Sequence, residues 1–292
     1  MKLAFLIGTG RCGSTLVHEI LARHPAFGFV SNLEDNLLHV NRLGRMNRRL
    51  YRSSLGWVTK KGGIRFAPSE AYRIIGREVS MIYMNSCRDL VEADVTPWLE
   101  GRFRRFFVDR ADAQNVEIFL HKYTGWSRIL FFHKIFPDAK FIHVVRDGRA
   151  VANSWLQMPW WNGYRGPENW LWGTLSPDLY AEWIREENSF VALAGLAWKL
   201  LIESADAAGA KLPGDRFLTL RFEDIVDNPI SAFEEMLKFI GLDMSDEFVA
   251  SLSRYEFSAA RRRAFEQDLG PSQIACVNRV SAGTLERFGY LD

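Results

Sequence analysis

Cysteine is scarce in this sequence. Only three of the 292 residues are cysteines, Cys12, Cys87 and Cys276, and they lie far apart. This spacing matches neither a disulfide framework nor a pattern of metal ligands. We therefore expect no disulfide and no metal site, and the low cysteine content is typical of a reducing compartment.

Long apolar runs are absent as well. No stretch of about 18 uninterrupted apolar residues occurs, so no transmembrane helix is expected. The chain opens on the short apolar run 3–7, without a separate hydrophobic leader or a small-residue cleavage site. These features predict a soluble protein of bacterial type in the cytoplasm.

An excess of charge of one sign is also missing. The formal net charge is +2 and the sequence pI is about 8.4, which is too mild to indicate nucleic-acid binding. Any basic effect must be local, as in 42–52, where five arginines accompany Leu43, Met46 and Leu50 at helical spacing. This pattern predicts an amphipathic helix whose basic face is either solvated or docks an acidic partner or an anionic membrane.

The sequence does contain a strand, loop and helix pattern at its start. The apolar run 3–7 is typical of a buried parallel strand, Gly8 to Gly13 of a tight loop, and the residues from Ser14 onward of a helix. Such a loop leaves backbone N–H groups unpaired at the positive end of a helix dipole. It therefore predicts a binding site for an anion.

This loop is almost a Walker A motif. Gly8 and Gly13 have the required spacing, but Ser14 stands where the ATP-binding motif has lysine, and the cation is Arg11 inside the loop. A missing lysine argues against ordinary ATP and Mg²⁺ chemistry, whereas the guanidinium fork suits a phosphate or sulfate. A P-loop kinase acting on a small molecule remains an alternative, as does a turn that binds nothing.

Three motifs in order resemble those of sulfotransferases that use 3′-phosphoadenosine-5′-phosphosulfate (PAPS). The matching segments are 11–15 with His24-Pro25, 140–154 with Arg146-Asp147-Gly148-Arg149, and 220–229 with Arg221-Phe222-Glu223-Asp224. The residues of the last two segments are most similar to those of the tyrosylprotein and carbohydrate branches of the family. The resemblance implies an α/β, P-loop-like fold of three layers, with a central parallel sheet flanked by helices, over a single domain of residues 1–292.

The resemblance also implies the residues that bind the donor. The 5′-phosphosulfate is expected on Arg11, Cys12, Gly13, Ser14 and Thr15. The 3′-phosphate is expected to bind Arg146, Ser154 and Arg287. We place Arg287 in a late basic loop that contains glycine. Phe222 is expected beside the adenine.

Catalytic residues follow from the same resemblance. Lys122 ends an apolar strand, 116–122, at a position where the family has a lysine that contacts the transferring sulfuryl group. Arg11 is expected to be a second catalytic cation. The acceptor hydroxyl must lose a proton to a nearby carboxylate or imidazole. Glu34, with an offset of two residues, occupies the family's general-base position, and Asp35 and His121 are its rivals.

The segment 155–200 is rich in tryptophan and tyrosine and is broken by Gly and Pro. We expect it to be an excursion over the mouth of the acceptor site, because aromatic walls recognise ligands by area and stacking. The sequence thus predicts transfer of the sulfuryl group of PAPS to a hydroxyl or amine of a small molecule, carbohydrate or peptide, without a metal. A non-catalytic nucleotide-binding protein of the same fold remains possible.

Overall fold

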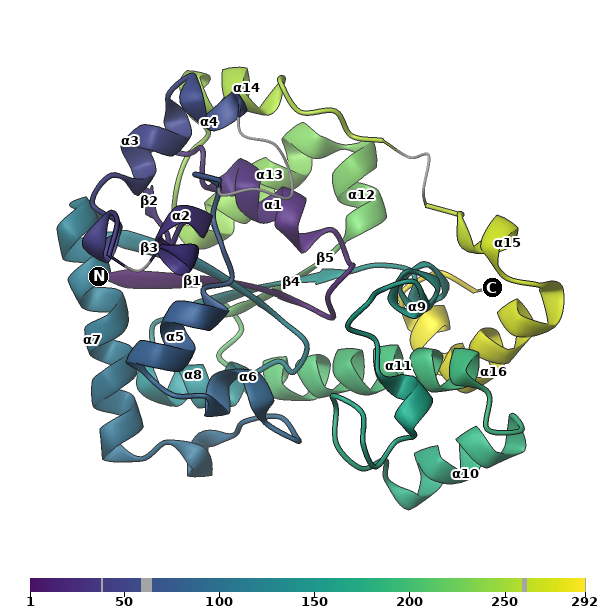
Figure 1. Cartoon of the computed structure of the whole chain (residues 1–292). Helices are drawn as coiled ribbons and strands as arrows, with labels where there is room; N and C mark the ends of the chain where they lie inside the picture. Colours follow the sequence, from purple (N-terminus) through teal and green to yellow (C-terminus); the bar gives the residue numbers. More distant parts are fainter. Residues whose placement is uncertain (38, 59–64, 259–261, 292) are drawn as a thin grey trace.

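A five-stranded parallel sheet forms the centre of the molecule (Figure 1). The computed structural model describes residues 1–37, 39–58, 65–258 and 262–291. The strand order is β2-β3-β1-β4-β5, and every neighbouring pair is parallel. The strands are β1 (Lys2–Gly8), β2 (Phe27–Gly28), β3 (Ile118–Thr124), β4 (Lys140–Val145) and β5 (Phe217–Arg221). The expected α/β fold with a central parallel sheet is confirmed.

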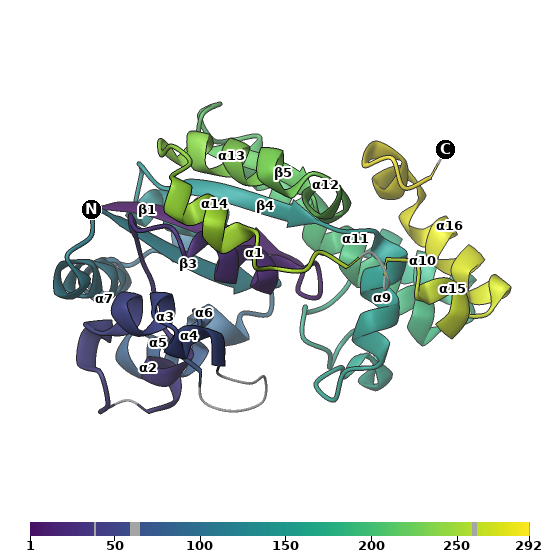
Figure 2. The ribbon, with the colours of Figure 1, turned by 90° about the horizontal axis from the view of Figure 1, so that it is seen from above.

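Helices cover both faces of the sheet, as the view from above shows (Figure 2). Alternation along β1 places Ala4 and Leu6 on one face and Leu3, Phe5 and Ile7 on the other. The first face packs against α1 (Ser14–Leu21), α12 (Phe222–Asp227), α13 (Pro229–Ile240) and α14 (Asp246–Leu252). The second packs against α7 (Pro97–Gln114), α8 (Ile129–Ile135) and α11 (Phe190–Gly209). These are the two outer layers of the fold.

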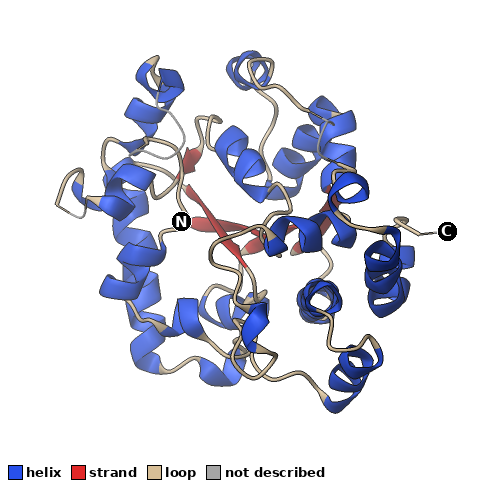
Figure 3. Cartoon of the chain, turned by 45° about the vertical axis from the view of Figure 1, so that its right-hand side comes forward, coloured by secondary structure: helices blue, strands red, loops and turns tan. Residues whose placement is uncertain are grey.

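A third apolar cluster lies beyond the carboxyl edge of the sheet. Its residues come from α9 (Gly148–Leu156), α11 and α16 (Pro271–Arg287), together with most of the tryptophans of 155–198. The helices η3 (Gly163–Arg165), α10 (Pro177–Arg185) and α15 (Phe265–Asp268) complete this part, which Figure 3 shows as a group of helices beside the strands.

Short helices fill the connection from β2 to β3. They are α2 (Asn32–Asn36), η1 (Arg42–Gly44), α3 (Asn47–Arg52), α4 (Leu55–Val58), α5 (Tyr72–Glu78), α6 (Ile82–Asn85) and η2 (Glu92–Asp94). The single amphipathic helix expected over 42–52 is therefore wrong, because Leu43 has a φ of 58°, which ends the turn before α3 begins.

The arginines Arg48 and Arg52 of α3 have helical spacing, but they do not form a solvated basic face. Arg48 donates hydrogen bonds to the carbonyls of Gln114 (2.7 Å) and Pro25 (2.6 Å), and Arg52 donates to that of Phe27 (2.9 Å). These two side chains satisfy backbone carbonyls around β2. They are consequently not available as a basic docking face.

The segment 177–209 is likewise divided into two helices, α10 and α11. Glu187 and Asn188 have φ values of 54° and 57°, and α11 starts anew after Ser189, whose hydroxyl accepts hydrogen bonds from the N–H groups of Val191 and Ala192. This is an ordinary N-cap that local sequence chemistry favours over continuation. Among the described residues, no helix is long and apolar enough to span a membrane.

Candidate active site

The carboxyl ends of four parallel strands meet at one edge of the sheet, where open α/β sheets bind ligands. A cavity of about 700 Å³ lies there. It is lined by the loop between β1 and α1, the end of β3, Arg146, and residues from the segments 70–86 and 160–172. Five of the predicted donor residues, Arg11, Gly13, Ser14, Thr15 and Arg146, thus line one cavity together with residues from two distant parts of the chain.

The loop between β1 and α1, residues 9–13, has the conformation of an anion cradle. Gly10, Arg11 and Gly13 have φ values of 81°, 58° and 87°. The N–H groups of 10–13 donate no hydrogen bond to any residue that the structure describes. A Cβ on Gly13 would overlap the Phe222 ring, so glycine is required there. The loop is therefore closely packed on one side and offers free donors to a ligand.

Three predicted donor residues are in direct contact. Arg11 Nε donates to Ser154 Oγ at 2.9 Å, and Arg146 Nη1 donates to the Arg11 carbonyl at 3.0 Å. The Arg146 guanidinium also lies 5.5 Å from the centre of the Phe222 ring. Cys12 points the other way, since its side chain is buried in the apolar core, so only its backbone faces the loop.

Lys122 lies between the loop and an acid that the sequence did not single out. Its Nζ donates to Thr15 Oγ1 at 2.8 Å and forms an ion pair with Glu70 Oε1 at 2.6 Å. The side chain is only 3% exposed. A buried ammonium held at the end of a strand, beside an anion cradle, can stabilise negative charge that develops on a bound ligand.

Glu70 is a carboxylate that lines the cavity. It also accepts a hydrogen bond from Thr124 Oγ1 at 3.0 Å. Burial alone would raise its pKa, but the Lys122 ammonium and hydrogen bonds from Lys122, Tyr72 and Thr124 outweigh burial and lower it. Glu70 follows Pro68 and Ser69 in the sequence, which is typical of a helix start, so no local signal marked it as a candidate base.

Asp35 holds the segment that carries Glu70. Its two carboxylate oxygens accept hydrogen bonds from Ser69 Oγ (2.8 Å) and the Ile74 N–H (3.0 Å). These contacts fasten both ends of the turn 69–74. Asp35 is thus committed to positioning this segment and does not line the cavity.

Comparisons with known proteins identify the family of this chain. Residues 4–246 match the model of the sulfotransferase family. The chain belongs to the sulfotransferase family. The omega-hydroxy-beta-dihydromenaquinone-9 sulfotransferase of Mycobacterium bovis is 23% identical to it over 176 residues, which are 59% of this chain but 41% of that protein. The match thus spans less than half of the relative's length.

Solved structures of sulfotransferases share the fold. Sulfotransferase STF9 from Mycobacterium avium has a TM-score of 0.61 at 14% identity, covering 98% of this chain and 76% of that one. The sulfotransferase domain of the Synechococcus PCC 7002 olefin synthase has a TM-score of 0.55 at 19% identity, covering 100% and 96%. At these identities the likeness concerns the fold alone.

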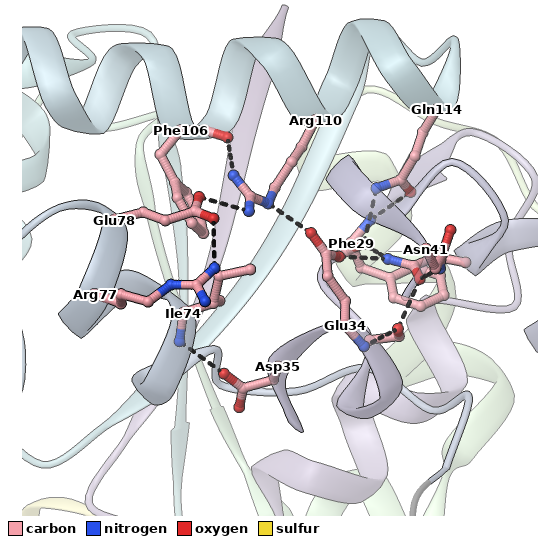
Figure 4. Close-up of polar contacts among 12 residues, drawn as sticks. Phe29, Glu34, Asp35, Asn41, Ile74, Arg77, Glu78, Phe106, Arg110 and Gln114 are labelled. Carbon is pink, nitrogen blue, oxygen red and sulfur yellow. Dashed lines mark hydrogen bonds and ion pairs between the residues drawn. The ribbon is translucent and has the colours of Figure 1, made fainter. Parts of the chain in front are cut away.

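Glu34 does not line the cavity. Figure 4 shows it beside Arg110 of α7, with which it forms a separate polar network. Its carboxylate is 1% exposed, pairs with Arg110 Nε at 2.8 Å and accepts a hydrogen bond from Asn47 at 2.9 Å. Arg110 in turn pairs with Glu78 at 2.8 Å. Burial raises the pKa of Glu34 although Arg110 opposes it. These contacts make Glu34 part of a buried network between α2 and α7.

His121 faces the side of the sheet opposite to Lys122, as strand alternation predicted. It packs against Phe5 and Phe107, and a hydrogen bond of 2.9 Å joins its Nε2 to the Tyr83 hydroxyl. Burial lowers its pKa to about 3. A neutral imidazole inside the core does not reach an acceptor in the cavity.

Arg287 also lies away from the cavity lining. The expected late basic loop is wrong, because the residues form α16, and Arg287 at its end pairs with Asp206 of α11 at 2.6 Å. The helix begins with Pro271 in its first turn, and proline at this position is a strong signal for the start of a helix.

The aromatic segment does reach the cavity. Trp160, Leu171 and Trp172 line it, and the Trp172 ring stacks on that of Trp155 with centroids 4.8 Å apart. Trp126, on the turn after β3, completes an apolar wall that the sequence had not indicated.

Proposed function

We propose that this protein transfers the sulfuryl group of PAPS to an acceptor hydroxyl or amine and releases adenosine 3′,5′-bisphosphate. The observation that carries the proposal is the contact of Arg11 with Ser154 and Arg146 at the rim of the β1–α1 loop. Two guanidinium groups and a hydroxyl beside a row of free N–H groups suit a ligand with two separate phosphate groups.

In this proposal the chain divides the donor between two sets of residues. The loop N–H groups with Arg11, Ser14 and Thr15 bind the 5′-phosphosulfate, and Arg146 with Ser154 binds the 3′-phosphate. Phe222 contributes its ring to the adenosine side, and Cys12 contributes only its N–H. We assign no contact to Arg287. Because Arg11 and Lys122 supply positive charge where a kinase uses a metal, we propose that no metal is needed.

The transfer is an in-line displacement at sulfur. The acceptor oxygen forms a bond to sulfur while the bond from sulfur to the 5′-phosphate oxygen breaks, and the electron pair stays on that phosphate. Lys122 stabilises the leaving phosphate, and Arg11 the sulfuryl oxygens. We propose Glu70, in place of Glu34, as the general base that takes the acceptor proton.

The ion pair between Lys122 and Glu70 suggests how the base becomes active. In the structure the ammonium lowers the pKa of Glu70, which keeps the carboxylate ionised but weakens it as a base. When donor phosphate draws Lys122 away, that effect is lost and burial raises the pKa of Glu70. Donor binding would thus prepare the base.

Finer assignments belong to the same proposal. The motifs at Arg146 and Arg221 favour the tyrosylprotein and carbohydrate branches. Residues 1–292 act as one sulfotransferase domain, with 155–200 forming the acceptor side, as the position of Trp160 and Trp172 supports. A cytoplasmic location stays a prediction.

The direct test measures transfer of labelled sulfate from PAPS to candidate acceptors by Arg146→Ala and Arg11→Met variants. We expect the KM for PAPS to rise at least about tenfold for each, since a charge-assisted hydrogen bond is lost. Arg105→Ala, on the exposed side of α7, is the matched control. An unchanged KM for PAPS in Arg146→Ala would overturn the donor assignment.

A further inference from the structure

Arg128 is a buried cation that the proposed transfer does not use. It is 4% exposed and lines the cavity at the turn after β3. Its Nη1 donates to the carbonyls of Thr124 (3.3 Å) and Trp126 (2.8 Å), whereas its Nε has no hydrogen-bond partner. Within the described chain, no carboxylate forms an ion pair with its guanidinium, although Asp89 Oδ1 accepts a hydrogen bond from the Arg128 backbone N–H at 2.7 Å.

Aromatic rings do not replace the missing negative charge. The guanidinium lies 5.0 Å from the centre of the Tyr83 ring and 5.5 Å from that of Tyr123, which gives a weak cation–π attraction. A buried guanidinium without a direct ion-pair partner is costly, and two backbone carbonyls could be served by a neutral donor. Arg128 is therefore suited to a negative group that enters the cavity.

Indole donors surround the same turn. Trp126 lines the cavity and its buried Nε1 has no partner. Trp172 Nε1 lies 3.9 Å from the point where a Cβ on Gly125 would be, so this N–H also comes close to the turn. The Arg128 guanidinium, with the Trp172 N–H close to the same turn, suits a monoanion such as a carboxylate, whereas the other cavity-lining cations, Arg11, Lys122 and Arg146, are assigned to the donor side.

The rest of this wall is apolar. Met84, Trp160 and Leu171 line the cavity, and Trp160 and Leu171 are 45% and 48% exposed. Exposed large apolar side chains at a cavity mouth mark a surface that an apolar ligand covers. An acceptor that contacts them has a hydrocarbon or aromatic body.

Thr124 connects this anion site to the reaction centre. Glu70 accepts a hydrogen bond from its hydroxyl, and Arg128 donates one to its carbonyl. The proposed base Glu70 and the cation Arg128 therefore both contact Thr124. We propose that the acceptor is an amphipathic hydroxy acid, with its hydroxyl at Glu70, its apolar body on the Met84 and Leu171 wall, and its carboxylate on Arg128. This assignment rests on the proposed function, and the transfer step is unchanged.

Binding of decanoate below its micelle concentration tests the carboxylate site without knowledge of the acceptor. Calorimetry on protein saturated with adenosine 3′,5′-bisphosphate would compare decanoate with decan-1-ol. We expect decanoate to bind at least about tenfold more tightly, as one charge-assisted hydrogen-bonded pair predicts. Arg128→Gln removes this preference, and the exposed Arg105→Gln control keeps it.

Because Arg128 also holds two backbone carbonyls, Trp172→Phe provides a second variant that leaves this turn intact. It removes one N–H and keeps the ring, so decanoate is expected to lose part of its advantage over decan-1-ol. Equal binding of acid and alcohol, no binding of decanoate, or a preference that survives Arg128→Gln would overturn the proposal. Failure to bind adenosine 3′,5′-bisphosphate, measured first in the same titration, would instead count against the proposed function.

Discussion

Lys122, which is buried, and Glu70, which is half-buried, form an ion pair of 2.6 Å between two segments 52 positions apart, at the point where the β1–α1 loop meets the acceptor side of the cavity. The same Lys122 Nζ contacts Thr15 of that loop. One side chain thus connects the residues assigned to the donor with the residue assigned to proton transfer. Substitution of Lys122 and substitution of Glu70 are therefore expected to have different effects on the reaction.

Replacing Lys122 with Met removes the cation that we assign to the leaving phosphate. We expect kcat to fall about 10²- to 10³-fold, which is the usual cost of removing one such electrostatic contact. Steady-state kinetics with PAPS measure this, and the exposed Lys134→Met serves as the control. A kcat within a few-fold of the wild-type value would show that Lys122 is only a structural strand-end residue.

Replacing Glu70 with Gln keeps its shape and removes its basicity. We expect kcat to fall about 10²- to 10⁴-fold, with little change in the affinity for adenosine 3′,5′-bisphosphate. Glu34→Gln is the informative comparison, because Glu34 lies outside the cavity lining. The folded fraction of that variant should keep its kcat. The reverse pattern would restore Glu34 as the base.

The pair of Glu34 and Arg110 is expected to matter for stability. Arg110→Met leaves the Glu34 carboxylate buried without its cation, so the free energy of unfolding should drop by about 3–5 kcal/mol. Denaturant unfolding followed by circular dichroism measures this. The double variant Glu34→Gln/Arg110→Met should lose less than the sum of the two single losses. Additive losses would mean that the pair contributes no coupling.

His121 predicts a loss of stability in acid. Its pKa is about 3 in the folded protein against an ordinary value of 6.5, so between these pH values the unfolded chain binds a proton that the folded protein does not. The free energy of unfolding therefore falls as the pH drops below 6.5. His121→Gln should reduce that slope by up to about 1.4 kcal/mol per pH unit. Unfolding curves of the wild-type protein and of His121→Gln at pH 7.5 and 5.5 test this. If the free energy of unfolding changed equally with pH in both proteins, the assignment would be contradicted.

The parallel strands, and the position of three proposed donor residues at their carboxyl ends, could be predicted because this information is local. Arg146 and Phe222 each directly follow a parallel strand, Arg11 comes three residues after another, and parallel strands bring their carboxyl ends together. Glu70 could not be predicted in this way. Its role depends on Lys122, which approaches it only in the folded chain.

The position of Glu34 outside the cavity lining and the broken helix in 42–52 have a related cause. A carboxylate near the position of a family motif is indistinguishable in sequence from one that pairs with Arg110 on α7. Likewise, the arginines of 42–52 have helical spacing, but Arg48 and Arg52 bind carbonyls of a distant loop. In both cases tertiary contacts decide what local pattern leaves open.

The most direct test of the central claim is calorimetric titration of the purified protein with adenosine 3′,5′-bisphosphate in the absence of metal, compared with ADP and Mg²⁺. The account predicts tight binding of the bisphosphate without metal and much weaker binding of ADP with Mg²⁺. A preference for ADP with Mg²⁺ would contradict the assignment of PAPS as donor. It would instead favour a P-loop kinase, with Thr15 and Asp147 as the residues to examine as metal partners.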